Sequence, residues 1–354
     1  FDVQERVSRA IVDALEVELT TSEIGRLAAR PIQNARAFEL YLEARAEMRR
    51  YGASLDRAKM LLDRAVEIEG ESPPLRAMRA FLEFSKVRGG TATDLRPLDV
   101  AESEAKALIE LVPDAPYGHA LLGFVGYERG DLKQAARHLT RALELDPADP
   151  DVLFFLAITL QAAGQIEPAR VLAERFYSAD PLSSFAAMLV GVAEWFAGRP
   201  GHRLDVMEQG VAMDPQNPII HWGVGYTYAL AGRMSDAATH AAWLLEHAPQ
   251  VAYTTQLVSL LHAAEDRRDD ALAALGGLDF AALDSHHTFH LSESFAMAGD
   301  TARALELLEW AVDHGFYPYR FFAEWCRFME PLRGMAEFDR IVAKAARRVA
   351  EFSA

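Results

Sequence analysis

The chain has 354 residues and a formal net charge of −16 at pH 7, and 51% of its residues are hydrophobic. The acidic balance argues against nucleic acid and anionic membranes as main partners, because phosphate groups are bound by basic surfaces. Cys326 is the only cysteine, so no disulfide and no cysteine metal site can form within one chain, and a reducing, cytoplasmic location is expected. The most apolar run, residues 182–197, contains Glu194 and favours a buried helix over a membrane span.

Residues 1–35 are predicted to form an amphipathic helix followed by a linker. The apolar residues of the helix lie four apart, which places them on one face: Val3, Val7, Ile11 and Leu15. Pro31 interrupts the pattern before the next helix. The chain opens with Phe1 rather than Met, so we expect it to be part of a longer polypeptide.

Residues 36–316 are predicted to form about eight pairs of helices. Prolines recur every 34 residues from the second pair onward: Pro113, Pro147, Pro181, Pro215 and Pro249. Glycines that suit a left-handed helix end recur with the same period: Gly130, Gly164, Gly198 and Gly232. A second set of small residues falls within the first helix of each pair, where it lets the paired helix approach closely: Gly123, Ala157, Gly191 and Gly225.

This pattern resembles tetratricopeptide repeats, in which each 34-residue unit is a helix–turn–helix. The resemblance covers most of the chain and implies an all-α, right-handed superhelical solenoid. Exposed ends of such arrays need a cap, and residues 317–354 are predicted to supply it with a C-terminal helix bearing Phe338, Ile341 and several basic residues. A β-sheet between residues 36 and 316 would contradict this prediction.

The repeat at 184–217 is predicted to be the loosest joint. Arg203 occupies the position where the other repeats have alanine on the second helix. A long charged side chain cannot enter a close helix crossing, so either the helices splay or Arg203 turns outward.

In tetratricopeptide repeats the first helices line a concave face, and the resemblance implies that certain positions of these helices meet the ligand. These positions, with one neighbour, carry mostly aromatic residues here: Tyr117, Phe124, Tyr127, Phe154, Phe155, Ile158, Phe185, Met188, Trp195, Trp222, Tyr226 and Tyr253. One interpretation is an apolar recognition groove for a protein, a peptide or a small apolar ligand. The other is that the aromatics fill a tightly wound superhelix. Charge is almost absent from these positions, which disfavours a partner that presents a terminal carboxylate.

The sequence contains few groups suited to catalysis. His286 and His290 lie four apart and are joined by His287, a spacing that metal ligation could use, but the glutamate of H-E-x-x-H is missing. No phosphate-binding loop, serine-hydrolase motif or catalytic cysteine context is present. We therefore predict no cofactor and no enzymatic activity, with a metal-dependent enzyme that uses the three histidines as a remote alternative.

The two ends of the chain carry a narrower resemblance. Residues 1–15, followed by residues 37–45, are similar to the junction in large bacterial signalling proteins, where a class III adenylate cyclase, a serine/threonine kinase or a winged-helix regulator precedes a tetratricopeptide half. The closing residues 330–334 with Phe338 are similar to the ends of those halves. The resemblance implies a non-enzymatic sensory or scaffold module. Its alternative is a dimerisation module whose groove receives the amphipathic helix.

Overall fold

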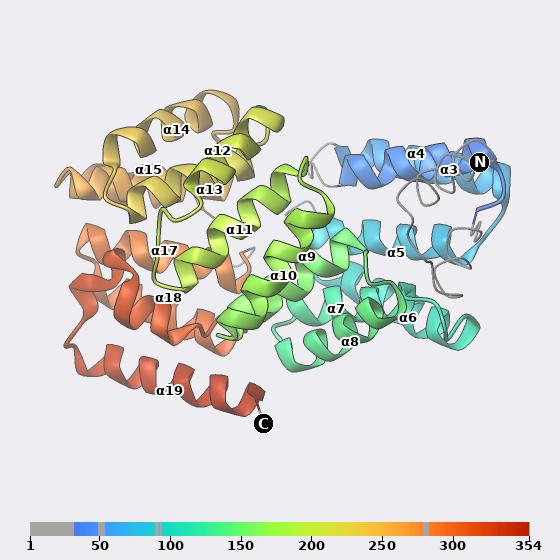
Figure 1. Ribbon diagram of the computed structural model, residues 1–354. Coiled ribbons are helices and arrows are strands. Elements are labelled where there is room, and N and C mark those ends of the chain that lie inside the picture. The colour runs from blue at the N-terminus through green and yellow to red at the C-terminus, as the bar shows by residue number, and fades with distance from the viewer. Residues whose placement is uncertain (1–31, 49–53, 89–91, 93, 279–282, 354) are drawn as a thin grey trace, which may run out of the picture. The chain divides into compact units, whose positions relative to one another are not determined.

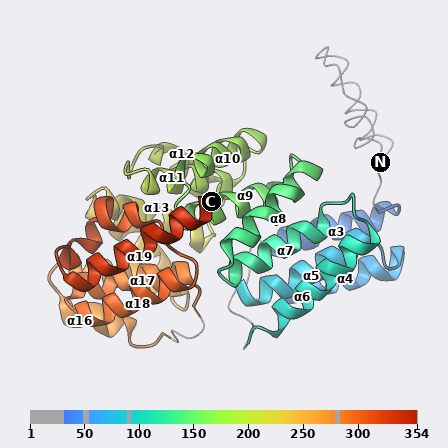
Figure 2. The same ribbon diagram turned by 90° about the horizontal axis from the view of Figure 1, so that it is seen from below.

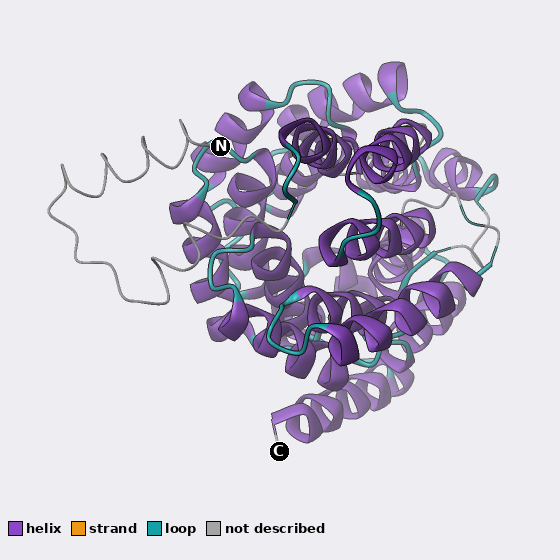
Figure 3. Ribbon diagram, turned by 90° about the vertical axis from the view of Figure 1, so that its right-hand side faces the viewer, coloured by secondary structure: helices purple, strands orange, loops and turns teal. Residues whose placement is uncertain are grey.

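The computed structural model describes residues 32–48, 54–88, 92, 94–278 and 283–353, and all regular elements in these ranges are helical (Figures 1 and 3). The predicted amphipathic helix in residues 1–20 lies outside the described residues. The helices α3 to α18 form eight consecutive antiparallel pairs. The prediction of an all-α solenoid of about eight helix pairs is therefore confirmed.

The helices belong to two compact units, residues 1–113 and 114–354. The first unit contains two pairs: α3 (Ala35–Met48) with α4 (Ser54–Glu69), and α5 (Pro73–Arg88) with α6 (Arg96–Leu111). Leu40, Leu62 and Leu75 are among the residues that join its core. The division into residues 1–35, 36–316 and 317–354 stays a prediction.

The second unit contains six pairs and the C-terminal elements. The pairs are α7 (Tyr117–Glu128) with α8 (Leu132–Leu145), α9 (Pro150–Ala162) with α10 (Ile166–Ala179), α11 (Ser184–Phe196) with α12 (Leu204–Met213), α13 (Pro218–Leu230) with α14 (Met234–His247), α15 (Ala252–Ala264) with α16 (Arg268–Leu275), and α17 (Ser285–Ala298) with α18 (Thr301–Asp313). The polar residues before the first helices cap them, since Asp149, Ser183 and Asn217 accept hydrogen bonds from backbone N–H groups of the first turn.

The glycines within the first helices allow the paired helices to approach closely. A Cβ atom added to Gly123 would collide with the Leu139 side chain of α8, and one added to Gly191 would collide with the Met207 side chain of α12. The second helix thus fills the space that the missing side chain leaves, which outweighs the helix propensity of about 1 kcal/mol that glycine forfeits.

The α11–α12 pair departs from the regular repeat as predicted for Arg203. Helix α12 begins only at Leu204, and Arg203 precedes it with a left-handed φ of 65°. The Arg203 side chain is half-buried and forms an ion pair with Glu174 of α10. Arg203 therefore stays outside the helix crossing, and the second helix is shortened to 10 residues.

The C-terminal strap, residues 314–335, crosses the turns that end four first helices. It includes the π-helix η2 (Phe321–Trp325) and the 3₁₀-helix η3 (Arg327–Leu332). The contacts follow the order of the repeats: Gly130 faces His314, Gly164 lies near Pro318 and closer still to Val349 of the C-terminal helix, Gly198 faces Trp325 and Gly232 faces Arg327. The backbone N–H of Tyr317 also donates to the Ala162 carbonyl at 2.8 Å. The strap consequently ties the last repeat of the unit to its first four.

Helix α19 (Ala336–Ser353) lies alongside α18 and covers the last pair (Figure 2). Its apolar side buries Phe338 and Ile341, while Arg340 and Lys344 bind Glu309 of α18 at 2.7 and 3.1 Å. The hydrogen bond from Arg340, followed by the one from Lys344, lowers the pKa of Glu309 to about 2. None of the helices in the described ranges is both long enough and apolar enough to cross a membrane.

Candidate functional site

The structure divides the predicted groove residues into a buried set and a half-buried set, all on first helices of the second unit. The buried set comprises Phe124, Phe155, Met188, Trp195, Trp222, Tyr226 and Tyr253. The half-buried set comprises Tyr117, Tyr127, Phe154, Ile158 and Phe185. Only the second set retains side-chain surface that a partner can reach.

Trp195, Trp222 and Tyr226 lie together and are buried, which for these three residues favours the interpretation that the aromatics fill the superhelix. Their ring centroids are 4.8 to 6.0 Å apart, and their exposed fractions are 1%, 3% and 0%. Two features cover them. Helix α17 lies against α13, and the ring centroids of His290 and Trp222 are 5.0 Å apart. On the strap, the ring centroid of Phe328 is 5.7 Å from that of Tyr226. This part of the concave face is a closed core.

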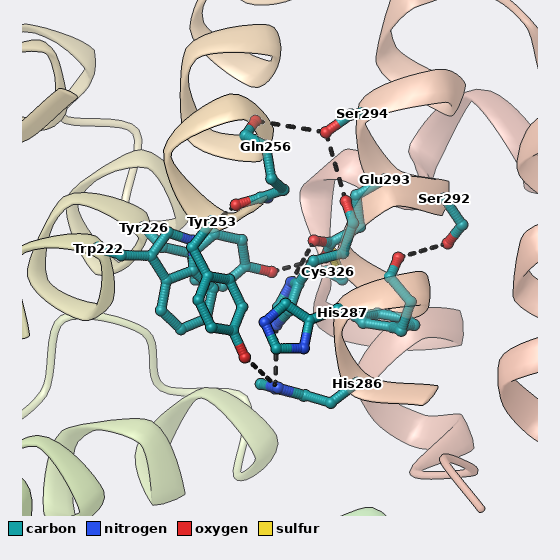
Figure 4. A network of polar contacts seen from close by, with 12 residues as sticks. Trp222, Tyr226, Tyr253, Gln256, His286, His287, Ser292, Glu293, Ser294 and Cys326 are labelled. Carbon is teal, nitrogen blue, oxygen red and sulfur yellow. Dashed lines mark hydrogen bonds and ion pairs between the residues drawn. The ribbon is translucent and has the colours of Figure 1, made fainter. Parts of the chain in front are cut away.

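A polar network around Glu293 of α17 joins three first helices and the strap (Figure 4). Its Oε1 atom accepts hydrogen bonds from the Tyr226 hydroxyl at 2.6 Å and from the Cys326 thiol at 2.9 Å. Its Oε2 atom lies 2.7 Å from Nδ1 of His290. Glu293 is fully buried, so each of its oxygens depends on these partners.

The pKa values indicate that Glu293 and His290 are both neutral near pH 7. Burial raises the pKa of Glu293 to about 8, although the hydrogen bonds from Cys326 and Tyr226 oppose the shift. Burial also holds the pKa of His290 well below its usual range. In this neutral pair the protonated carboxyl donates to Nδ1 of His290, and no charge remains in the core.

The same network accounts for the histidines of the predicted cluster. Nε2 of His290 lies 3.1 Å from Nε2 of His286, whose Nδ1 lies 3.1 Å from the Tyr253 hydroxyl. His287 lies 2.9 Å from the Asp284 carboxylate and stacks on Tyr253. Within the described residues no group of three or more His, Cys, Asp and Glu side chains is arranged to hold a metal ion. The hypothesis of a three-histidine metal centre is therefore not supported.

The half-buried set forms what we call the α7–α11 face: Tyr117, Tyr127, Phe154, Ile158 and Phe185. Ring contacts link Tyr127, Phe154 and Phe185 through the buried Phe155. The distance between ring centroids is 6.1 Å from Tyr127 to Phe155, 5.4 Å from Phe155 to Phe154 and 5.9 Å from Phe154 to Phe185. These three residues and Phe155 thus form a continuous row of aromatic rings on the first helices of three successive repeats, α7, α9 and α11.

Sequence reasoning missed Glu293, Cys326 and the strap. Glu293 and Cys326 are 33 residues apart and outside the repeat pattern, so no spacing connects them. The strap could have been predicted from its aromatic residues, such as Phe321, Phe322 and Phe328. Such a run after the last repeat indicates a segment that needs an apolar surface to cover.

Comparison with known proteins agrees with the architecture. The tetratricopeptide repeat family profile matches residues 127–189, from the end of α7 into α11. The match identifies a tetratricopeptide repeat segment within these residues, and the helix pairs described above have the same helix–turn–helix form on both sides of it.

One curated relative is 36% identical over 75 residues: a probable biofilm formation methyltransferase, WspC, of Pseudomonas putida. The match covers 21% of this chain and 18% of that protein. Among solved structures, a tetratricopeptide repeat protein from Parabacteroides merdae is 14% identical, with a TM-score of 0.47 over 78% of this chain and 99% of that one. PilF from Pseudomonas aeruginosa is 17% identical, with a TM-score of 0.44 over 56% of this chain and 88% of its own.

Proposed function

We propose that this chain is a non-enzymatic protein-interaction module that binds an apolar segment of a protein or peptide partner on the α7–α11 face. The observation that carries the proposal is the half-burial of the aromatic row on α7, α9 and α11. These rings are held in place by a packed core, yet each keeps surface exposed to solvent. Contiguous apolar surface of this kind is typical of binding sites.

Energetics favour a small number of anchor residues. Complete burial of a large apolar side chain contributes about 1.5–3 kcal/mol, so two or three partner side chains placed against Phe154, Ile158 and Phe185 would dominate the affinity. Phe154 and Phe185 meet edge to face at 5.9 Å, and both pack against the α9–α11 core with Ile158. The face is therefore ordered before the partner binds, which limits the entropy lost on binding.

We place the module in the cytoplasm, within a bacterial signalling protein. The support for this context is the similarity of residues 1–15 and 330–334 to such proteins, together with the unpaired Cys326. The relative named as a biofilm methyltransferase is bacterial, but the match covers 18% of its length. Its activity is therefore not transferred to this chain.

The experiment is a selection of peptides from a display library, followed by affinity measurement on variants. Phe154→Ser should weaken binding of the selected peptides at least about tenfold, because it removes an anchor of roughly 1.5–3 kcal/mol. The matched control is Val171→Ser on α10, an apolar side chain that is 67% exposed on a second helix. Equal binding by the two variants would contradict recognition through the α7–α11 face.

Self-association is the alternative, and the amphipathic stripe Val3, Val7, Ile11 and Leu15 favours it. In that case a second copy of the chain supplies the segment that covers the face. Light scattering distinguishes the two proposals. A defined dimer that Val7→Asp converts to a monomer supports self-association, whereas a wild-type monomer supports recognition of another protein.

A further inference from the structure

Two histidine pairs occupy equivalent places in different repeats. His119 and His138 lie in the α7–α8 repeat, and His221 and His240 lie exactly three repeats later in α13–α14. The two intervening repeats have apolar residues at both positions: Leu153 with Leu172, and Ala187 with Val206. The two positions thus change together, from a pair of imidazoles to a pair of apolar side chains.

Within each repeat, the pair brings two ring nitrogens together across the helix crossing. The Nδ1 atoms of His119 and His138 are 3.0 Å apart, and those of His221 and His240 are 3.2 Å apart. The ring centroids are 5.3 Å apart in both pairs. His119, His138 and His240 are half-buried and His221 is buried, so each pair has at least one ring that reaches the surface.

We propose that each pair is a two-histidine binding site for a borderline divalent transition metal such as Zn²⁺, Ni²⁺ or Cu²⁺, with water completing the coordination. Imidazole is the protein ligand that suits these ions. Two nitrogens about 2.0–2.1 Å from a tetrahedral ion lie about 3.3 Å apart, close to the separations in both pairs.

The second pair also shows how a ligand nitrogen is oriented. Nε2 of His221 lies 3.1 Å from the Pro215 carbonyl, to which it donates, so Nδ1 of His221 carries a lone pair. Without a metal ion this lone pair accepts a hydrogen bond from Nδ1 of His240, and a bound ion would take the place of that proton. Metal-bound histidines are commonly fixed in this way by a backbone carbonyl on the other ring nitrogen. The His221 ring is further held by stacking on Trp243, with centroids 3.7 Å apart.

Protonation does not compete with a metal ion at neutral pH. Burial lowers the pKa of all four histidines, and that of His240 falls to about 4. The imidazoles are therefore neutral at pH 7, as metal binding requires.

The two sites differ in nearby charge, which predicts an order of affinity. Glu208 and Asp236 act on His240, and their negative charge favours a bound cation. Arg141 acts on His119, and Arg137 acts on His138 together with Asp131, so the first site carries more positive charge. The site at His221 and His240 should bind the ion more tightly.

The test is calorimetric titration of the full chain with NiCl₂ and with ZnCl₂ at pH 7.5. The matched variants insert the residues found at the same positions in the intervening repeats, namely His119→Leu with His138→Leu, and His221→Ala with His240→Val. Each double variant should lose one ion per chain, and the second should lose the tighter one. If a double variant does not fold, His138→Gln and His240→Gln each remove one ligand and should also abolish binding at their own site.

The proposal is overturned if the wild-type chain binds neither metal, or if both ions still bind after both pairs are replaced. The second result would assign the metal to other histidines of the chain.

Discussion

Trp222 and Phe154 occupy the same position of their repeats but have different surroundings. Trp222 is 3% exposed and donates through Nε1 to Gln256 Oε1 at 2.7 Å, whereas Phe154 is half-buried. We expect Trp222→Ala to lower the free energy of unfolding by roughly 3–5 kcal/mol, because it opens a cavity in the core. Phe154→Ala should lower it by about half as much, since less of its area is buried. Urea denaturation measures both, and equal losses would contradict the division into buried and half-buried residues.

The pKa of Glu293 gives a second prediction at this scale. In the unfolded chain the carboxyl ionises near pH 4.5, but in the folded protein it stays neutral up to about pH 8. The folded state therefore loses stability relative to the unfolded state as pH rises from 4.5 to 8. Glu293→Gln cannot ionise, and its amide can replace the hydrogen bonds of the neutral acid. Its stability relative to wild type should increase across this range, and a constant difference would show that Glu293 is ionised in the folded state.

At the scale of elements, the strap is held by close approach to the helix ends that it crosses. Gly198 has φ +75°, and a Cβ atom added there would lie 2.7 Å from the Trp325 ring. Gly70 has a similar φ of +83° and no neighbour within 4 Å of such an atom. Both substitutions to alanine incur the strain of a left-handed residue, about 1–2 kcal/mol. Gly198→Ala should also displace Trp325, at a further cost of about 1–3 kcal/mol. Thermal denaturation should show the larger decrease in melting temperature for Gly198→Ala. Equal decreases for the two variants would mean that the strap does not pack closely against the turn at Gly198.

At the scale of the whole molecule, buried and half-buried histidines make the free energy of unfolding depend on pH. Burial lowers the pKa of five of them: His119, His138, His221, His240 and His290. Below about pH 6.5 the unfolded chain binds protons that the folded protein does not, so the free energy of unfolding falls with decreasing pH. Above pH 6.5 these groups are neutral in both states and have no effect. Urea denaturation at pH 7 and pH 5.5 should show the fall, and His119→Leu with His138→Leu should reduce it. If the pH dependence of that variant equals that of the wild type, the lowered pKa values of His119 and His138 are not a cause of the fall in stability.

The sequence by itself determined the helix pairs, because their signals are local and repeat every 34 residues. Gly123 and Gly191 predicted where paired helices approach closely, and Arg203 predicted an irregular second helix. Each of these features depends on contacts between neighbouring elements, so the repeat period is sufficient to locate them.

Only the tertiary structure decided which part of the concave face stays accessible. Within the second unit α17 lies against α13, and the strap returns over the first four repeats of that unit. Trp195, Trp222 and Tyr226 are therefore covered, while Phe154 and Phe185 are only half-buried. The pairing of Tyr226 with Glu293, 67 residues apart, belongs to the same closure. A repeat pattern specifies the contacts between neighbours, whereas the exposure of a concave face depends on the accumulated winding and on a segment that carries no repeat.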